Sequence, residues 1–184
     1  MPAKSSTQTT DVPERSTLGA GRSLLFLREE ELRLAQDLLF FGYRDFTAGA
    51  DEILAELGMG RAHHRVLHFV GRRPGITVGD LLGILAITKQ SLGRVLQPLV
   101  EEGYVTQTPG RSDRRQRLLT LTEKGAALER RLFDRQRETV MRAYREAGPA
   151  AVEGFRRVMH GLMGEQARAA CDTLEGPPAL GPAR

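Results

Sequence analysis

The stretch ITVGDLLGILAITKQSLGRVLQPLVEEGYV, residues 76–105, carries two short helical apolar patterns separated by a tight turn. Thr77 is placed to cap the first helix and Thr88 the second, because a threonine hydroxyl accepts hydrogen bonds from the free N–H groups of a first helical turn. The second helix is expected to end at Gly103. Two such helices form a helix-turn-helix. Their apolar sides are predicted at Leu81, Leu82 and Leu85, and at Leu92, Val95, Leu96, Leu99 and Val100.

The chain continues into PGRSDRRQRLLTLTEKG, residues 109–125. Residues 104–108 and 117–121 alternate in the manner of strands, and Pro109-Gly110 separates them. The sequence therefore predicts a β-hairpin directly behind the helix-turn-helix. Positive charge is concentrated at its tip, where a single acid, Asp113, stands among Arg111, Arg114, Arg115 and Arg117.

Helices are predicted on both sides of this region. The first repeats an apolar residue every seven positions, at Leu25, Leu32, Leu39 and Phe46, which gives a long apolar stripe. Thr122 is expected to cap a long helix that stops at Gly148-Pro149. The helices flanking the helix-turn-helix and hairpin are predicted at residues 23–48, 51–57, 61–71, 123–147 and 151–174.

These elements predict a mostly α fold with a small β-hairpin wing, built as one unit over residues 23–174. Residues 1–22 and 175–184 are rich in small and turn-forming residues and are expected to be disordered tails. The apolar stripes on the first and last helices lack sufficient partners in one small chain. A symmetric pairing of two copies is therefore predicted to bury them.

The arrangement indicates binding to double-stranded DNA. A helix-turn-helix delivers its second helix to the major groove, and an arginine-rich hairpin tip suits the negative potential of the minor groove. The alternative for the tip is an ordinary solvated turn. Asp113 either fixes the Arg115 guanidinium or only initiates the turn. The residues predicted to contact DNA are Thr88, Lys89, Gln90, Ser91, Arg94, Arg111, Asp113, Arg114, Arg115 and Arg117.

The run GRSDRRQRLLTLTEKG, with its Asp113/Arg115 pair and the LTxxG pattern ending at Gly125, resembles the MarR family of bacterial winged-helix regulators. The resemblance extends over roughly residues 24–170. It implies a homodimer in which residues 23–48 and 123–174 interdigitate with the partner, while residues 51–122 form the winged helix-turn-helix. It also implies a pseudo-palindromic operator, regulation most often by repression, and a small-molecule effector near the junction of the two parts.

Two further features are open to more than one interpretation. His64 and His68 are four residues apart, a spacing that allows a shared metal, although ordinary packing or hydrogen bonding is favoured because no third ligand is evident in the sequence. The family resemblance implies that they line the junction of the two parts, which also makes them candidate effector contacts. Pro98 lies inside the second helix of the helix-turn-helix. It is expected to bend that helix at a cost of about 3 kcal/mol.

Composition and motifs exclude several classes. The chain has 184 residues, 40% hydrophobic and 27% charged, without an apolar run of membrane-spanning length or a secretory signal, so a cytoplasmic protein is expected. No phosphate-binding glycine loop or nucleophile elbow is present, so neither an enzyme nor a cofactor is expected. The main alternative to DNA binding is a winged helix that docks an acidic protein surface.

Overall fold

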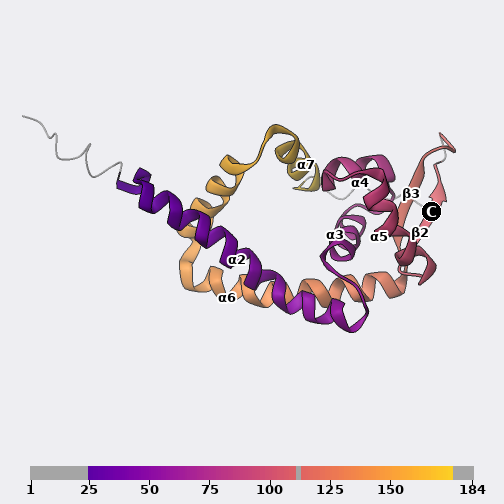
Figure 1. The fold of residues 1–184 in the computed structure, drawn as a ribbon, viewed down its shortest axis with the longest axis horizontal. Coiled ribbons are helices and arrows are strands. Elements are labelled where there is room, and N and C mark those ends of the chain that lie inside the picture. Colours follow the sequence, from indigo (N-terminus) through magenta and orange to yellow (C-terminus); the bar gives the residue numbers. More distant parts are fainter. Residues whose placement is uncertain (1–24, 111–112, 176–184) are drawn as a thin grey trace, which may run out of the picture. The chain divides into compact units, whose positions relative to one another are not determined.

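The computed structural model describes residues 25–110 and 113–175 (Figure 1). The predicted tail at 1–22, residues 176–184 of the predicted tail at 175–184, and the wing residue Arg111 lie outside the described residues. Glu175 is the last residue of α7. The chain divides into two compact units between Tyr43 and Arg44. The elements are η1 (Leu25–Leu27), α2 (Glu29–Glu56), α3 (Arg61–Arg72), β1 (Ile76–Thr77), α4 (Val78–Leu85), α5 (Lys89–Glu101), β2 (Val105–Pro109), β3 (Arg117–Leu121), α6 (Glu123–Leu162) and α7 (Glu165–Glu175).

The predicted fold class is confirmed, with one addition to the sheet. β2 and β3 form the expected antiparallel hairpin, in which Pro109 pairs with Arg117. The two-residue strand β1 adds a third strand on the other side of β3, which gives the order β1-β3-β2. A strand of two residues leaves no alternating pattern, so the sequence did not reveal it.

The core of the second unit lies between α3, α4, α5, the sheet and the first half of α6. Of the side chains predicted to face inward on α5, Leu92, Leu96 and Leu99 are buried, and Val95 and Val100 are half-buried against the same core. The largest fully buried side chains are Leu54, Leu67, Leu81, Leu92, Leu99, Leu119, Leu132, Val66, Val70 and Val105. Burial of each such side chain stabilises the fold by about 1.5–3 kcal/mol.

The first helix is longer than expected. The prediction of separate helices at 23–48 and 51–57 is wrong, because α2 runs without a break from Glu29 to Glu56. Gly49 does not interrupt it. A Cβ there would lie 2.8 Å from Nε of Arg135, so the glycine allows α6 to pack closely against this part of α2.

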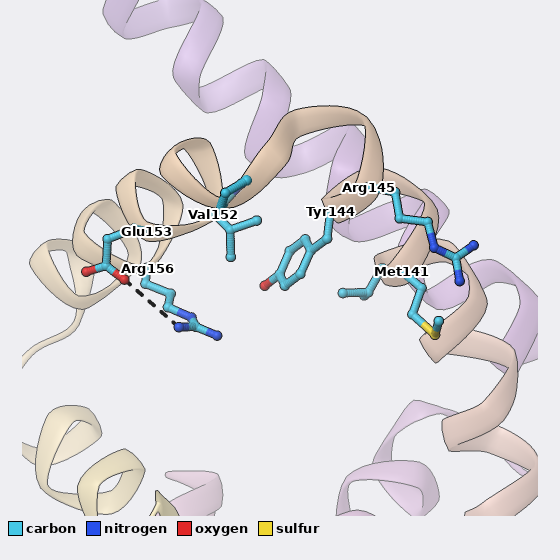
Figure 2. Close-up of a pocket in the computed structure, with 8 residues that line it drawn as sticks. Met141, Tyr144, Arg145, Val152, Glu153 and Arg156 are labelled. Carbon is cyan, nitrogen blue, oxygen red and sulfur yellow. Dashed lines mark ion pairs between the residues drawn. The ribbon is translucent and has the colours of Figure 1, made fainter.

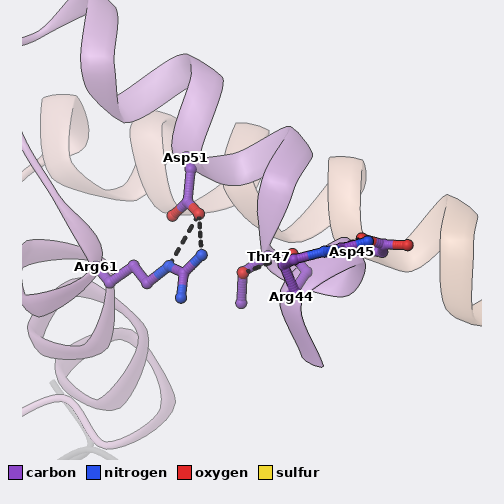
Figure 3. A network of polar contacts seen from close by, with 5 residues as sticks. All are labelled: Arg44, Asp45, Thr47, Asp51 and Arg61. Carbon is purple, nitrogen blue, oxygen red and sulfur yellow. Dashed lines mark hydrogen bonds and ion pairs between the residues drawn. The ribbon is translucent and has the colours of Figure 1, made fainter. Parts of the chain in front are cut away.

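The C-terminal end of α2 is joined to α3 by an ion pair (Figure 3). The Arg61 guanidinium donates from Nε to Oδ2 of Asp51 at 2.9 Å, and its terminal nitrogen lies 2.7 Å from the same oxygen. One turn earlier, the Thr47 hydroxyl donates to the carbonyl oxygen of Arg44 at 3.0 Å. The Asp51–Arg61 pair thereby fixes the start of α3 against α2.

The first unit exposes most of its large apolar side chains. Leu32 is 50% exposed, and Leu38 and Phe40 are each 64% exposed. Leu32 and Leu38 belong to the broad apolar stripe that the sequence predicts, whereas Phe40 is not among the residues predicted for it. An exposed stripe of this size is unusual for a surface that stays in water and is typical of an interface.

The long helix α6 contains the predicted break. Gly148 has φ 78° and ψ 168°, outside the helical region, and Pro149 follows it. The prediction of one last helix over 151–174 is wrong, because α6 ends at Leu162 and α7 begins at Glu165. Met163 has an extended backbone, and Arg168 donates to the His160 carbonyl at 3.0 Å, which caps the end of α6.

Helix α7 lies beside α4 within the second unit (Figure 1). Gln166 donates from Nε2 to the carbonyl oxygen of Gly83 in α4 at 3.4 Å. At the other end of α7, Arg72 of α3 donates to the carbonyl oxygen of Leu174 at 2.8 Å. Among the described residues no helix is long and apolar enough to cross a membrane.

Candidate DNA-binding interface

The two helices of the predicted helix-turn-helix are capped as the sequence indicates. The Thr77 hydroxyl accepts from the Asp80 N–H at 3.0 Å, and the Thr88 hydroxyl accepts from the Ser91 N–H at 3.2 Å. Ala86, between the helices, has a left-handed backbone with φ 51° and ψ 42°. The tight turn therefore sits where it was predicted, and it orients α5 relative to α4.

One face of α5 is exposed and polar, and the opposite face is buried. Lys89, Gln90 and Arg94 lie on the exposed side, as predicted. Thr88 and Ser91 are exposed as well, but their hydroxyls are 2.9 Å apart and bond each other. The amide, ammonium and guanidinium groups are therefore better placed to contact another molecule, while Thr88 and Ser91 mainly fix the start of the helix.

Pro98 does not end α5. The helix continues to Glu101, and the carbonyl oxygen of Pro98 accepts from the Glu102 N–H at 2.9 Å. Proline removes the hydrogen bond that its own nitrogen would donate, and its ring crowds the carbonyl of the residue four positions earlier, here Arg94. The exposed first turns of α5, including Lys89 and Gln90, precede this position.

The wing carries exposed arginines on a closed turn. Gly110 donates to the Gln116 carbonyl at 3.0 Å, which closes the hairpin beyond the last pair of the β2–β3 ladder. Asp113 Oδ1 accepts from the backbone N–H of Arg115 at 2.9 Å. This contact is a turn-forming one, so the geometry favours the second of the two alternatives for Asp113. The exposed cations described here are Arg114, Arg115 and Arg117.

The base of the wing is fixed to α6 by Thr122, which caps the helix as predicted, and by contacts of Gly125 and Lys124 that the sequence did not reveal. The Thr122 hydroxyl donates to the Gly103 carbonyl at 2.6 Å and accepts from the Gly125 N–H at 3.0 Å. A Cβ on Gly125 would overlap the carbonyl oxygen of Tyr104. Lys124 lies over the Tyr104 ring, with Nζ 3.9 Å from the ring centroid. The LTxxG pattern therefore encodes a close approach between α6 and the start of β2.

The two histidines lie on α3 without a metal-binding set around them. Burial lowers the pKa of His64, partly opposed by the Asp51 carboxylate. Burial also lowers the pKa of His68, and His64 and Arg72 add to the shift. Nδ1 of His68 is 3.7 Å from Oε1 of Glu129, whose pKa is raised by burial. The described residues contain no group of three or more candidate metal ligands.

A hollow lies away from the helix-turn-helix, on the inner side of the bend in α6 (Figure 2). It has a volume of about 660 Å³. Glu153 and Arg156 form an ion pair at 3.9 Å on one side, and the Tyr144 ring points into the space between the two arms of the helix. Phe155, Val158 and Leu162, on the same second arm, are exposed.

A capped helix-turn-helix, followed directly by a cationic β-hairpin, defines a winged-helix DNA-binding protein. A family model described as the MarR family matches residues 57–116, which cover α3 to the wing. The chain is also 52% identical over 143 residues to the HTH-type transcriptional regulator PetP of Rhodobacter capsulatus. That alignment covers 78% of this chain and 86% of PetP.

Solved structures show the same fold. A cysteine-to-serine mutant of Escherichia coli MarR complexed with operator DNA superimposes with a TM-score of 0.59 at 22% identity, covering 76% of this chain and 99% of that chain. Streptococcus pneumoniae FabT in complex with DNA has a TM-score of 0.64 at 16% identity, covering 71% and 94%. The chain belongs to the MarR family and is a DNA-binding transcriptional regulator.

Proposed function

We propose that two copies of this chain bind one pseudo-palindromic operator, with α5 of each copy in a major groove and each wing over the adjacent minor groove. The observation that carries the proposal is the placement of Lys89, Gln90 and Arg94 on the exposed face of α5, in the same compact unit as the arginines of the wing. Half-sites about one helical turn apart, roughly 34–36 Å, would let both α5 helices meet the same side of the duplex.

The exposed apolar residues support the dimer. In the first unit they include Leu32, Leu38 and Phe40, and in the second they include Phe155 and Val158. Each unit therefore presents apolar surface that its own contacts leave in water. We propose that residues 23–48 and 123–174 cover this surface with the same regions of a second copy, as the family resemblance implies.

Titration against DNA at several salt concentrations tests the proposal. Operator fragments are first selected from random duplexes by the full chain, and their dissociation constants are then compared with those of unselected duplexes. Selective binding that weakens steeply with salt supports DNA recognition, because phosphate contacts release counterions. Equal affinity for every duplex, or binding only to an acidic protein surface, would contradict it.

Arg94→Ala separates base contact from phosphate contact on α5. We expect this variant to lose affinity for the selected operator more than for unselected DNA, because guanidinium groups read base edges in the major groove. Lys89→Ala is the matched comparison from the first turn of the same helix. An equal loss on both kinds of DNA would assign Arg94 to the phosphate backbone.

Repression and a small-molecule effector are part of the same proposal. A dimer seated over a promoter would block polymerase access, so a reporter carrying the selected operator should be silenced by the chain. An effector near His64 and His68 would meet two half-buried imidazoles whose charged form is disfavoured by burial. Operator affinity that is unchanged by His64→Ala in the presence and absence of Zn²⁺ would remove the metal-responsive alternative.

A further inference from the structure

The exposed face of α5 has a gap at its centre. Gln90, Gly93, Arg94 and Gln97 stand at intervals of three and four residues, so they share one face of the helix. All four are exposed, whereas Leu92, Leu96 and Leu99 on the other side are buried. Gly93 is the one position of the four that has no side chain to contribute.

Nothing in the described part of the chain requires glycine at this position. Gly93 is not among the glycines with positive φ, so it has no conformational need that alanine would fail to meet. A Cβ built on it would have no neighbour within 4 Å. In contrast, a Cβ on Gly71 would lie 3.1 Å from Leu121, and one on Gly125 would overlap Tyr104. Glycine in a helix interior is less stable than alanine, so Gly93 weakens α5 without a benefit inside the fold.

A benefit outside the fold follows from the neighbours of Gly93. Glycine permits close approach of the backbone to a ligand. Arg94 and Gln90 carry the guanidinium and amide groups that bond base edges, and Gln97 is steadied because its Nε2 donates to Glu101 Oε1 at 2.8 Å. The gap between them offers only Cα hydrogens, so it suits an apolar group. The apolar group that standard base pairs present in the major groove is the thymine methyl.

We propose that Gly93 is a specificity-determining residue, whose missing side chain leaves room on α5 for the methyl group of one thymine in each operator half-site. This inference rests on the proposed placement of α5 in the major groove. A larger residue at position 93 holds the helix away from that base pair. Gln90 and Arg94 then lose their bonding distance to the adjacent base edges as well.

Gly93→Ala tests the proposal, and Gly83→Ala is its control. Gly83 is also an exposed glycine of the helix-turn-helix whose Cβ would meet nothing within 4 Å, but it lies on α4. We expect Gly93→Ala to raise the melting temperature slightly, to weaken operator binding about tenfold, and to leave binding to unselected DNA unchanged; about tenfold is typical of one base contact. Gly83→Ala should leave both affinities unchanged.

Replacing each thymine of the selected operator with deoxyuridine, which lacks the methyl group, locates the contact. The wild-type chain should lose affinity at one symmetric pair of positions, and Gly93→Ala should be insensitive to the same replacement. Unchanged operator affinity of Gly93→Ala overturns the inference, as does an equal loss on all DNA or a lowered melting temperature. A wild-type chain that selects no duplex sequence overturns the proposed function itself, and the inference with it.

Discussion

The winged-helix region and the terminal helices use apolar residues in opposite ways. Between α3 and β3, side chains such as Leu67, Leu92 and Leu119 are completely or almost completely buried by the chain itself. In the N-terminal part of α2, Leu38 and Phe40 are each 64% exposed. The first region is packed by its own side chains, whereas the second leaves large apolar side chains in water. In the proposed assembly, DNA contact and dimerisation therefore depend on separate sets of residues, and substitutions should disturb one without the other.

The largest effect is expected at the exposed stripe of α2. Leu38→Glu should weaken the proposed dimer by roughly 3 kcal/mol or more, since two buried leucines of about 1.5–3 kcal/mol each are lost per dimer. Light scattering coupled to size exclusion measures the mass, and circular dichroism should show unchanged helix content. Gln36→Glu is the control, because it adds the same charge to the same helix. If both variants have the same mass as the wild type, the exposed stripe of α2 is not the dimer interface.

A second substitution addresses the winged-helix region. Gly125→Ala should lower the free energy of unfolding by roughly 1–3 kcal/mol, because the new methyl group overlaps the Tyr104 carbonyl and overpacked sites cost about that much. Chemical denaturation measures the change. Gly154→Ala is matched to it, since that glycine also lies in α6 but its Cβ would have open space. If the two variants have the same free energy of unfolding, the close packing of α6 against the start of β2 does not contribute measurably to stability.

The wing itself is tested by Arg115→Ala. Operator binding should weaken by about 1–3 kcal/mol, as expected for one lost groove contact, while the dimer mass stays the same. Fluorescence anisotropy at fixed salt gives the dissociation constant. Arg130→Ala removes an exposed arginine from α6 and should have little effect, since Arg130 pairs with Asp134 at 3.0 Å. An Arg115→Ala variant that binds as tightly as wild type would exclude the wing from the interface.

The smallest effect is expected from the histidines of α3. Burial lowers the pKa of His64 and of His68 below 6.5, so the unfolded chain binds protons more readily than the folded chain. Stability is therefore greatest above pH 6.5 and should fall as the pH drops below it. The raised pKa of Glu129 acts with the opposite sign, because the folded state takes up that proton first. The effect of Glu129 on stability is therefore expected at lower pH, nearer the ordinary glutamate pKa of 4.5.

Denaturant titrations between pH 7.5 and 5.5 follow this change. The double variant His64→Gln/His68→Gln should flatten the dependence just below pH 6.5. His160→Gln removes an imidazole from α6 and serves as the control. If the free energy of unfolding of the wild-type chain instead rises as the pH falls through this window, folding raises the pKa values of the two histidines rather than lowering them.

Local signals in the sequence predicted most of the winged-helix region. Thr77, Thr88 and Thr122 each cap the expected helix, because a cap depends on residues within one turn of it. The predictions were wrong where contacts between residues far apart in the sequence determine the structure. The helix α2 continues through Gly49, where Arg135 of α6 packs against it, and β1 forms only by pairing with β3.

The site shows the same division. The exposure of Lys89, Gln90 and Arg94 follows from the period of α5, whereas the use of the Asp113 carboxylate depends on the detailed turn geometry. In the turn it bonds the Arg115 backbone N–H. The empty space around Gly93 is equally invisible in sequence, because it is a property of the folded surface.

Hydroxyl-radical footprinting of the selected operator, combined with the binding stoichiometry, tests the central claim most directly. Two copies of the chain per duplex should protect two half-sites about one helical turn apart on the same side of the DNA, with additional protection in the flanking minor grooves beneath the wings. One copy per duplex, or a single protected half-site without flanking protection, would contradict the account.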